Sequence, residues 1–85
     1  MEMILSKQAL DDLESWLKTD VKVTKKLLKM LKEIAKTPYE GIGKPEPLKY
    51  SFSGCWSRRL TEADRIVYEV SETGILIRSC MGHYE

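Results

Sequence analysis

Apolar side chains recur every three or four residues through the first part of the chain, which is the spacing of amphipathic helices. One apolar stripe follows Ser6 and runs through Lys18, and a second follows Asp20 and ends before Pro38. Ser6 and Asp20 are residue types that cap helix N-termini. Because only residues 19–20 separate the two stripes, the pattern predicts an antiparallel helical hairpin.

Shorter apolar runs, rich in β-branched and aromatic residues, predict strands in the remainder of the chain. We expect them at residues 3–5, 48–52, 55–60, 65–70 and 75–81. The polar residues 61–64 connect two of these runs as in a β-hairpin, which we expect in the middle of the sheet. The sequence therefore predicts an α+β fold, with an N-terminal strand and a two-helix hairpin packed on one face of a mainly antiparallel sheet of about five strands.

The composition is that of one small folded domain spanning residues 1–85, because 42% of the residues are hydrophobic and 32% are charged. No apolar run approaches about 18 residues, and no charged segment followed by an apolar one opens the chain. We therefore expect neither export nor a membrane span, and the cytoplasm is the simplest compartment. Cys55 and Cys80 lie far apart and His83 is the only histidine, so the sequence predicts buried thiols, no metal site and no cofactor.

Positive charge is divided by residue type along the chain. All four arginines follow residue 57, whereas eight of the ten lysines precede residue 37. The net charge of +1 does not by itself indicate nucleic-acid binding. Six lysines recur at helical spacing opposite the second apolar stripe, namely Lys22, Lys25, Lys26, Lys29, Lys32 and Lys36. This row is either a solvated helix face or a basic ridge that lies along an RNA backbone.

Three of the arginines lie in the predicted hairpin. Side chains alternate between the two faces of a strand, so Arg58 and Arg59 must point to opposite faces. Arg65 follows the turn, and in a tight antiparallel register its guanidinium group comes near that of Arg59. Two arginines on one sheet face repel each other unless an anion lies between them. In the simplest case that anion is a surface carboxylate, from Glu62, Glu69 or Glu72.

The loop at residues 37–48 contains every proline of the chain, and its centre is Glu46 between Pro45 and Pro47. The following proline excludes Glu46 from the helical region, and the preceding ring fixes its own φ, so the carboxylate stands on a stiff, extended stem. A side chain on such a stem loses little conformational entropy when it binds a ligand or takes part in a reaction. The alternative is an ordinary exposed loop glutamate.

Several polar side chains of the second half together have the chemistry that metal-independent RNA cleavage requires. This reaction needs a base for the 2′-hydroxyl proton, cations for the crowded phosphorane, and an acid for the departing 5′-oxygen. The candidate set is Glu46, Lys49, Arg59, Arg65, His83 and Tyr84. The other notable side chains have structural expectations, with Trp16, Trp56 and Tyr68 in the core and Arg58 and Arg78 on the opposite sheet face or its rim.

Four ordered motifs strongly resemble the YoeB branch of the RelE/ParE toxin superfamily. They are GKPEPLK at 43–49, SGCWSRRL at 53–60, DRIVYEV at 64–70 and the HY pair at 83–84. The resemblance covers essentially the whole chain. It implies a small toxin that enters the ribosomal A site, cleaves the messenger RNA there, and is held inactive by a cognate, partly disordered YefM-like antitoxin. It also implies that homodimers form.

Position by position, the resemblance makes Glu46 the general base and His83 the general acid. Arg65 would stabilise the transition-state phosphate, assisted by Lys49 and Arg59. Histidine suits the acid role because its charge changes near neutral pH.

The resemblance also assigns Tyr84 to holding or stacking on the substrate. The chain departs from many relatives at Glu85, which adds a negative charge after the HY pair. Two other functions remain open at this point. One is a non-catalytic inhibitor of a protein target such as DNA gyrase, as in the ParE branch, and the other is a plain RNA-binding module.

Overall fold

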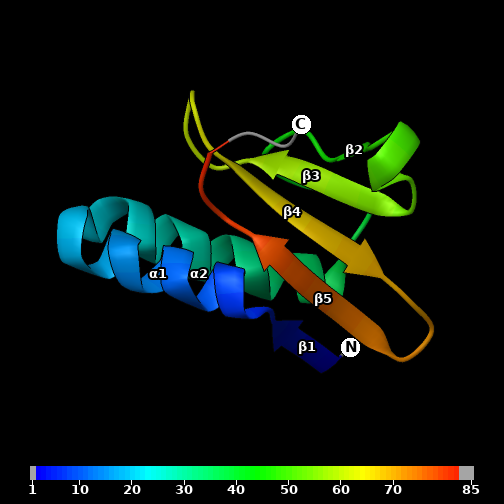
Figure 1. The fold of residues 1–85 in the computed structure, drawn as a ribbon, viewed down its shortest axis with the longest axis horizontal. Helices are drawn as coiled ribbons and strands as arrows, with labels where there is room; N and C mark the ends of the chain where they lie inside the picture. Colours follow the sequence, from blue (N-terminus) through cyan, green and yellow to red (C-terminus); the bar gives the residue numbers. More distant parts are fainter. Residues whose placement is uncertain (1, 83–85) are drawn as a thin grey trace.

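The computed structural model describes residues 2–82, and it has the predicted α+β architecture (Figure 1). A short strand is followed by two helices and then by the remaining strands. In chain order the elements are β1 (Glu2–Leu5), α1 (Lys7–Thr19), α2 (Val21–Lys36), β2 (Glu46–Pro47), the 3₁₀ helix η1 (Tyr50–Phe52), β3 (Cys55–Arg59), β4 (Arg65–Val70) and β5 (Gly74–Ser79).

Both helices begin at the predicted caps. Ser6 Oγ accepts a hydrogen bond from the Ala9 amide at 3.0 Å, and Asp20 Oδ1 accepts one from the Val23 amide at 3.2 Å. Asp20 also ends α1, because its own amide donates to the carbonyl of Trp16. The connection is therefore tight, and the helices lie side by side on one face of the sheet (Figure 1). Within residues 2–82, no helix is long and apolar enough to cross a membrane.

The sheet has five strands in the order β1-β5-β4-β3-β2. β1 pairs with β5 in parallel, and the other three pairings are antiparallel. The β3–β4 hairpin thus lies inside the sheet, as the sequence predicts. The first and last strands of the chain are direct neighbours.

The main core fills the space between the helices and the sheet. Its buried members come from both helices, from β4 and β5, and from the flanking turns: Ala9, Leu27, Met30, Leu31, Ile34, Leu60, Ile66, Tyr68, Ile75, Ile77 and Cys80. Trp16 and Trp56 pack against this cluster and are partly buried. A smaller cluster of Leu48, Cys55 and Val67 lies apart from it, on the other sheet face. Both cysteines are buried free thiols, as predicted.

The expectation of a strand at residues 48–52 is wrong. β2 ends at Pro47, and residues 50–52 form the 3₁₀ helix, with Tyr50 in the left-handed region at φ 58°. The chain must reverse direction here, because the Leu48 amide already donates to the carbonyl of Cys55 at 2.9 Å. Leu48 and Phe52 therefore pack in the small cluster from a turn, whereas Tyr50 is exposed.

Candidate functional site

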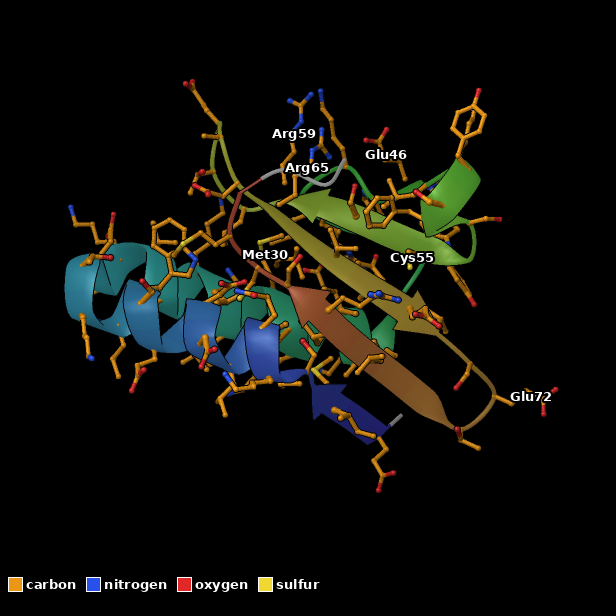
Figure 2. The ribbon with its side chains drawn as sticks, viewed as in Figure 1. Met30, Glu46, Cys55, Arg59, Arg65 and Glu72 are labelled. Carbon is orange, nitrogen blue, oxygen red and sulfur yellow. The ribbon has the colours of Figure 1, made fainter. Side chains whose placement is uncertain are left out.

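The candidate site lies on the sheet face that the helices leave open, towards the β2 edge (Figure 2). The pairing register explains why these side chains share a face. Glu46 of β2 pairs with Ser57 of β3, and Arg59 of β3 pairs directly with Arg65 of β4. Paired residues point to the same side of a sheet, and residues two apart in one strand do so as well. All four side chains are therefore on the open face.

Arg65 is held between two of these side chains. Its Nη1 lies 3.2 Å from Glu46 Oε1 and donates to Ser57 Oγ at 3.2 Å. The Arg65 side chain is 17% exposed, whereas that of Glu46 is 50% exposed. Ser57 is buried, so it forms the floor of this arrangement. The carboxylate is accessible from solvent, and the guanidinium group is fixed in orientation beneath it.

Arg59 is exposed and stands opposite Arg65, as the hairpin register predicts. Within residues 2–82, the carboxylate that pairs with Arg65 is that of Glu46, not one of those at positions 62, 69 and 72. Guanidinium groups are good ligands for phosphate oxygens, so the two arginines make this part of the face suited to a phosphate. Glu46 is extended, as its flanking prolines predict.

The end of the described chain is bound next to Arg65. Asp64 Oδ1 accepts a hydrogen bond from the Gly82 amide at 2.7 Å, and the Arg65 amide donates to the Gly82 carbonyl at 3.0 Å. Thr61 Oγ1 donates to Asp64 Oδ2 at 2.6 Å and so fixes this carboxylate within its turn. His83 and Tyr84 lie outside the described residues.

Ser57 and Asp64 are site residues that sequence reasoning missed. The signals were present but weak, since Ser57 shares its face with Arg59 by alternation and Asp64 directly precedes Arg65. Lys49 is exposed in the turn after β2. The six lysines of α2 are exposed as well, and Lys26 Nζ donates to the Leu60 carbonyl at 2.6 Å. Whether the row binds RNA stays a prediction.

A second polar group on the open face lies away from this site. Arg78 pairs with Glu69 at 2.7 Å, with both side chains about half exposed. Cys55 Sγ lies 3.8 Å from Glu69 Oε1, and burial together with this carboxylate raises the pKa of the Cys55 thiol. Among residues 2–82, no group of three or more His, Cys, Asp or Glu side chains is placed to hold a metal ion.

The family is decided by comparison with known proteins. Residues 5–84 match the profile described as the YoeB-like toxin of bacterial type II toxin-antitoxin systems. The chain belongs to this family of toxins. The Toxin YoeB of Escherichia coli K12 is 46% identical over 84 residues, which are 99% of this chain and all of that protein.

Solved structures agree with the YoeB-like assignment. The YoeB/ParE toxin from Agrobacterium tumefaciens superposes with a TM-score of 0.93 at 38% identity, covering 99% of this chain and all of that one. YoeB of Staphylococcus aureus has been solved in a complex with YefM and as a dimer. These two structures have TM-scores of 0.87 and 0.89 at 39% and 40% identity, and each covers 99% of this chain and 98% of that one.

Proposed function

We propose that this YoeB-like toxin is an endoribonuclease that enters the ribosomal A site and cleaves the messenger RNA there, which inhibits translation. The observation that carries the proposal is the ion pair between Glu46 and Arg65 on the open sheet face, with Arg59 paired directly opposite Arg65. The exposed carboxylate can act as a base, and the fixed guanidinium group can bind a phosphate. The two groups are close enough to contact the 2′-hydroxyl and the phosphate of the same nucleotide.

In the proposed reaction Glu46 takes the proton of a ribose 2′-hydroxyl, and the 2′-oxygen attacks the adjacent phosphorus. Arg65, with Arg59 and Lys49, stabilises the charge of the phosphorane. The bond to the 5′-oxygen then breaks, and His83 donates a proton to that oxygen. The products are a 2′,3′-cyclic phosphate and a free 5′-hydroxyl. Tyr84 holds or stacks on the substrate.

The geometry supports the division of roles among the described residues. Arg65 is the less exposed partner and is oriented by Ser57, which suits a group that stabilises charge without moving. Glu46 is more exposed, so a ribose can approach it. Gly82, the last of the described residues, is bound beside Arg65.

Primer extension on a messenger held in programmed ribosomes tests this function. Wild-type protein should give discrete cuts in the A-site codon, and Glu46→Ala should slow them by about 100- to 10,000-fold. A messenger with a 2′-deoxy nucleotide on the 5′ side of the cut should resist cleavage, because it lacks the nucleophile. Cleavage of that messenger at the normal rate would contradict the 2′-hydroxyl mechanism.

Intact messenger with wild-type protein would instead favour another function. A gyrase supercoiling assay then tests inhibition of a protein target. Salt-dependent ribosome or RNA binding without product would indicate a plain RNA-binding module.

The partner we propose is a cognate YefM-like antitoxin with a partly disordered segment that covers the open sheet face. The support is the solved YoeB–YefM complex of the S. aureus relative and the placing of two arginines, Arg59 and Arg65, opposite each other on this face. An acidic or amphipathic segment would pair with these arginines as it folds. Co-purification that leaves both arginines as accessible to modification as in the free toxin would contradict this placement.

Two further parts of the proposal follow from the same relatives. The S. aureus protein has been solved as a dimer, and light scattering on the purified toxin would show whether this chain also forms homodimers. We also propose a cytoplasmic location, because the proposed substrate is messenger RNA on translating ribosomes.

A further inference from the structure

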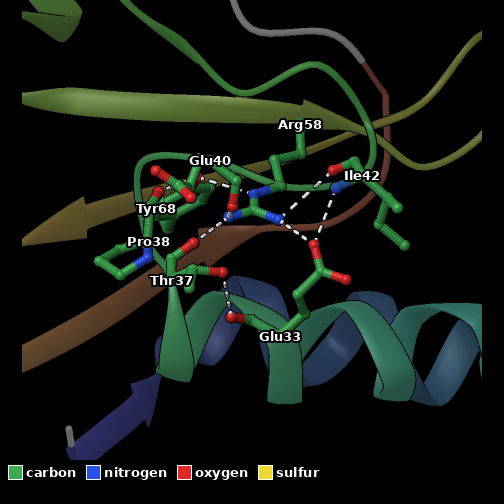
Figure 3. Close-up of polar contacts among 7 residues, drawn as sticks. All are labelled: Glu33, Thr37, Pro38, Glu40, Ile42, Arg58 and Tyr68. Carbon is green, nitrogen blue, oxygen red and sulfur yellow. Dashed lines mark hydrogen bonds and ion pairs between the residues drawn. The ribbon is translucent and has the colours of Figure 1, made fainter.

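The guanidinium group of Arg58 is fully buried on the helix-facing side of β3 (Figure 3). Its Nε donates to Tyr68 Oη at 3.0 Å, and its Nη1 donates to Glu33 Oε1 at 2.8 Å. Nη1 and Nη2 also donate to the carbonyls of residues 37, 40 and 42. A buried charge is tolerated only when it is paired and hydrogen-bonded, and here both conditions are met.

All three carbonyls belong to the loop that leads from α2 to β2. This loop, residues 37–45, forms neither helix nor strand, so its backbone groups need other partners. Tyr68 Oη donates to the Pro38 carbonyl at 2.6 Å, and Glu33 Oε1 accepts from the Ile42 amide at 2.8 Å. Burial raises the pKa of Tyr68, which keeps its hydroxyl a donor. We call Glu33, Arg58 and Tyr68 the loop clamp.

The loop backbone lies directly against the loop clamp. A Cβ atom on Gly41 would collide with Glu33 Oε1 and Arg58 Nη1, and Gly41 has φ +129°. Two residues later the Gly43 carbonyl accepts from the Arg59 amide at 2.7 Å. The loop is thus fixed to β3 up to three residues before Glu46.

We propose that the loop clamp is a positioning device for Glu46, and this role rests on the proposed function. Arg58 lies between Ser57 and Arg59, whose side chains face the site on the opposite side of β3. One short strand segment therefore fixes the loop on one face and the arginine pair on the other. The prolines around Glu46 make its stem stiff, so a shift at residues 42–44 is transmitted to the carboxylate rather than absorbed.

Tyr68→Phe is the main test, because it removes one hydroxyl and keeps the ring in the core. At saturating programmed ribosomes the cleavage rate should fall about 10- to 100-fold, the effect of a misplacement near 1 Å, while the half-saturating ribosome concentration stays unchanged. Hydrogen exchange at the Ile42 amide should become faster. An unchanged exchange rate at this amide would overturn the clamping role.

Coupling to Glu46 separates positioning from general stability. In a Glu46→Ala background, Tyr68→Phe should slow residual cleavage by less than about twofold, because the group it positions is absent. Ile75→Val is the matched control, since it removes one methyl group from the core at a position that pairs with Met3 and Val70 and with no residue of the loop clamp. It should leave the cleavage rate unchanged.

Two substitutions at Glu33 test whether an oxygen acceptor at this position is enough to hold the loop. Glu33→Gln removes the countercharge of Arg58 and should lower the stability of the fold, but it keeps an oxygen acceptor for the loop and should cleave within about threefold of wild type. Glu33→Ala should lose about as much activity as Tyr68→Phe. If wild type does not cut at all, the proposed function fails and the positioning role fails with it. If wild type cuts and Tyr68→Phe cuts at the same saturating rate, or slows equally with and without Glu46, only the positioning role is overturned.

Discussion

The side chains of Glu46 and Arg65 form an ion pair across β3, a strand that contains neither residue. Glu46 is in β2 and Arg65 is in β4, and their side chains meet at 3.2 Å over β3, which lies between these strands. Ser57 of β3 lies beneath the contact and accepts from Arg65 at 3.2 Å. The candidate site therefore exists only when three strands are in register, and the following predictions depend on this arrangement.

Arg65→Ala should affect activity far more than stability. Its ion pair with Glu46 is only partly exposed, and its loss also leaves the buried Ser57 hydroxyl without this donor, so the free energy of unfolding in urea should fall by no more than about 1–3 kcal/mol. Loss of one electrostatic stabiliser should slow ribosome-dependent cleavage by about 100- to 1,000-fold. Arg78→Ala breaks the exposed pair with Glu69 on the same sheet face and is the matched control. Equal cleavage by the two variants would mean that Arg65 has no special role.

Ser57→Ala should slow cleavage moderately by freeing the guanidinium group of Arg65. The hydroxyl contributes a hydrogen bond worth about 1 kcal/mol, which corresponds to roughly a fivefold change in rate. Single-turnover cleavage measures this change, and Ser53→Ala, in the exposed turn before β3, serves as the control. A wild-type rate for Ser57→Ala would show that the Ser57 hydroxyl is not needed to orient Arg65.

Asp64→Ala should loosen the end of the chain. The substitution leaves the Gly82 amide without its acceptor and removes the partner of Thr61, so the free energy of unfolding should fall by about 1–3 kcal/mol. Urea denaturation measures this loss, and Glu62→Ala in the same turn should have no comparable effect. Cleavage should fall as well, and by much less in a His83→Gln background if Asp64 acts through the chain end.

The stability of the fold should decrease in alkaline solution through Cys80. Burial raises the pKa of this thiol from 9.0 to about 12. Above about pH 9 the unfolded chain therefore loses the proton first, and the free energy of unfolding falls as the pH rises towards 12. Chemical denaturation between about pH 8 and pH 10 should show a shallower decline in Cys80→Ala than in wild type. Identical slopes would show that the thiol is not the titrating group.

The sequence alone was sufficient to predict those features of the fold that depend on residues close together in the chain. Ser6 and Asp20 cap the helices as their residue types predict, and alternation correctly separates Arg58 from Arg59. The resemblance to the YoeB family located Glu46 and Arg65, which the structure brings together. Their catalytic roles stay predictions.

Other features depend on contacts between distant segments, which local pattern cannot reveal. Residues 48–52 have strand composition, but Tyr50 adopts a left-handed conformation because the chain has to return alongside β2. The alternation of side chains along β3 showed which sheet face Arg58 is on. It did not show that the carbonyls of the loop at residues 37–45 accept hydrogen bonds from Arg58 on that face. Among residues 2–82, the carboxylate that pairs with Arg65 came from β2, two strands away in the sheet, and not from the carboxylates nearest in sequence.

The parallel pairing of β1 with β5 bears on how the protein is synthesised. β5 supplies the strand between β1 and β4, and Ile75 and Ile77 complete the core beneath the helices. Until β5 has left the ribosome, the nascent chain lacks the strand that joins β1 to the rest of the sheet, and contacts this distant in sequence form late in folding. A nuclease directed at ribosomes, as proposed above, thus acquires its folded form only after β5 has been translated and has left the ribosome.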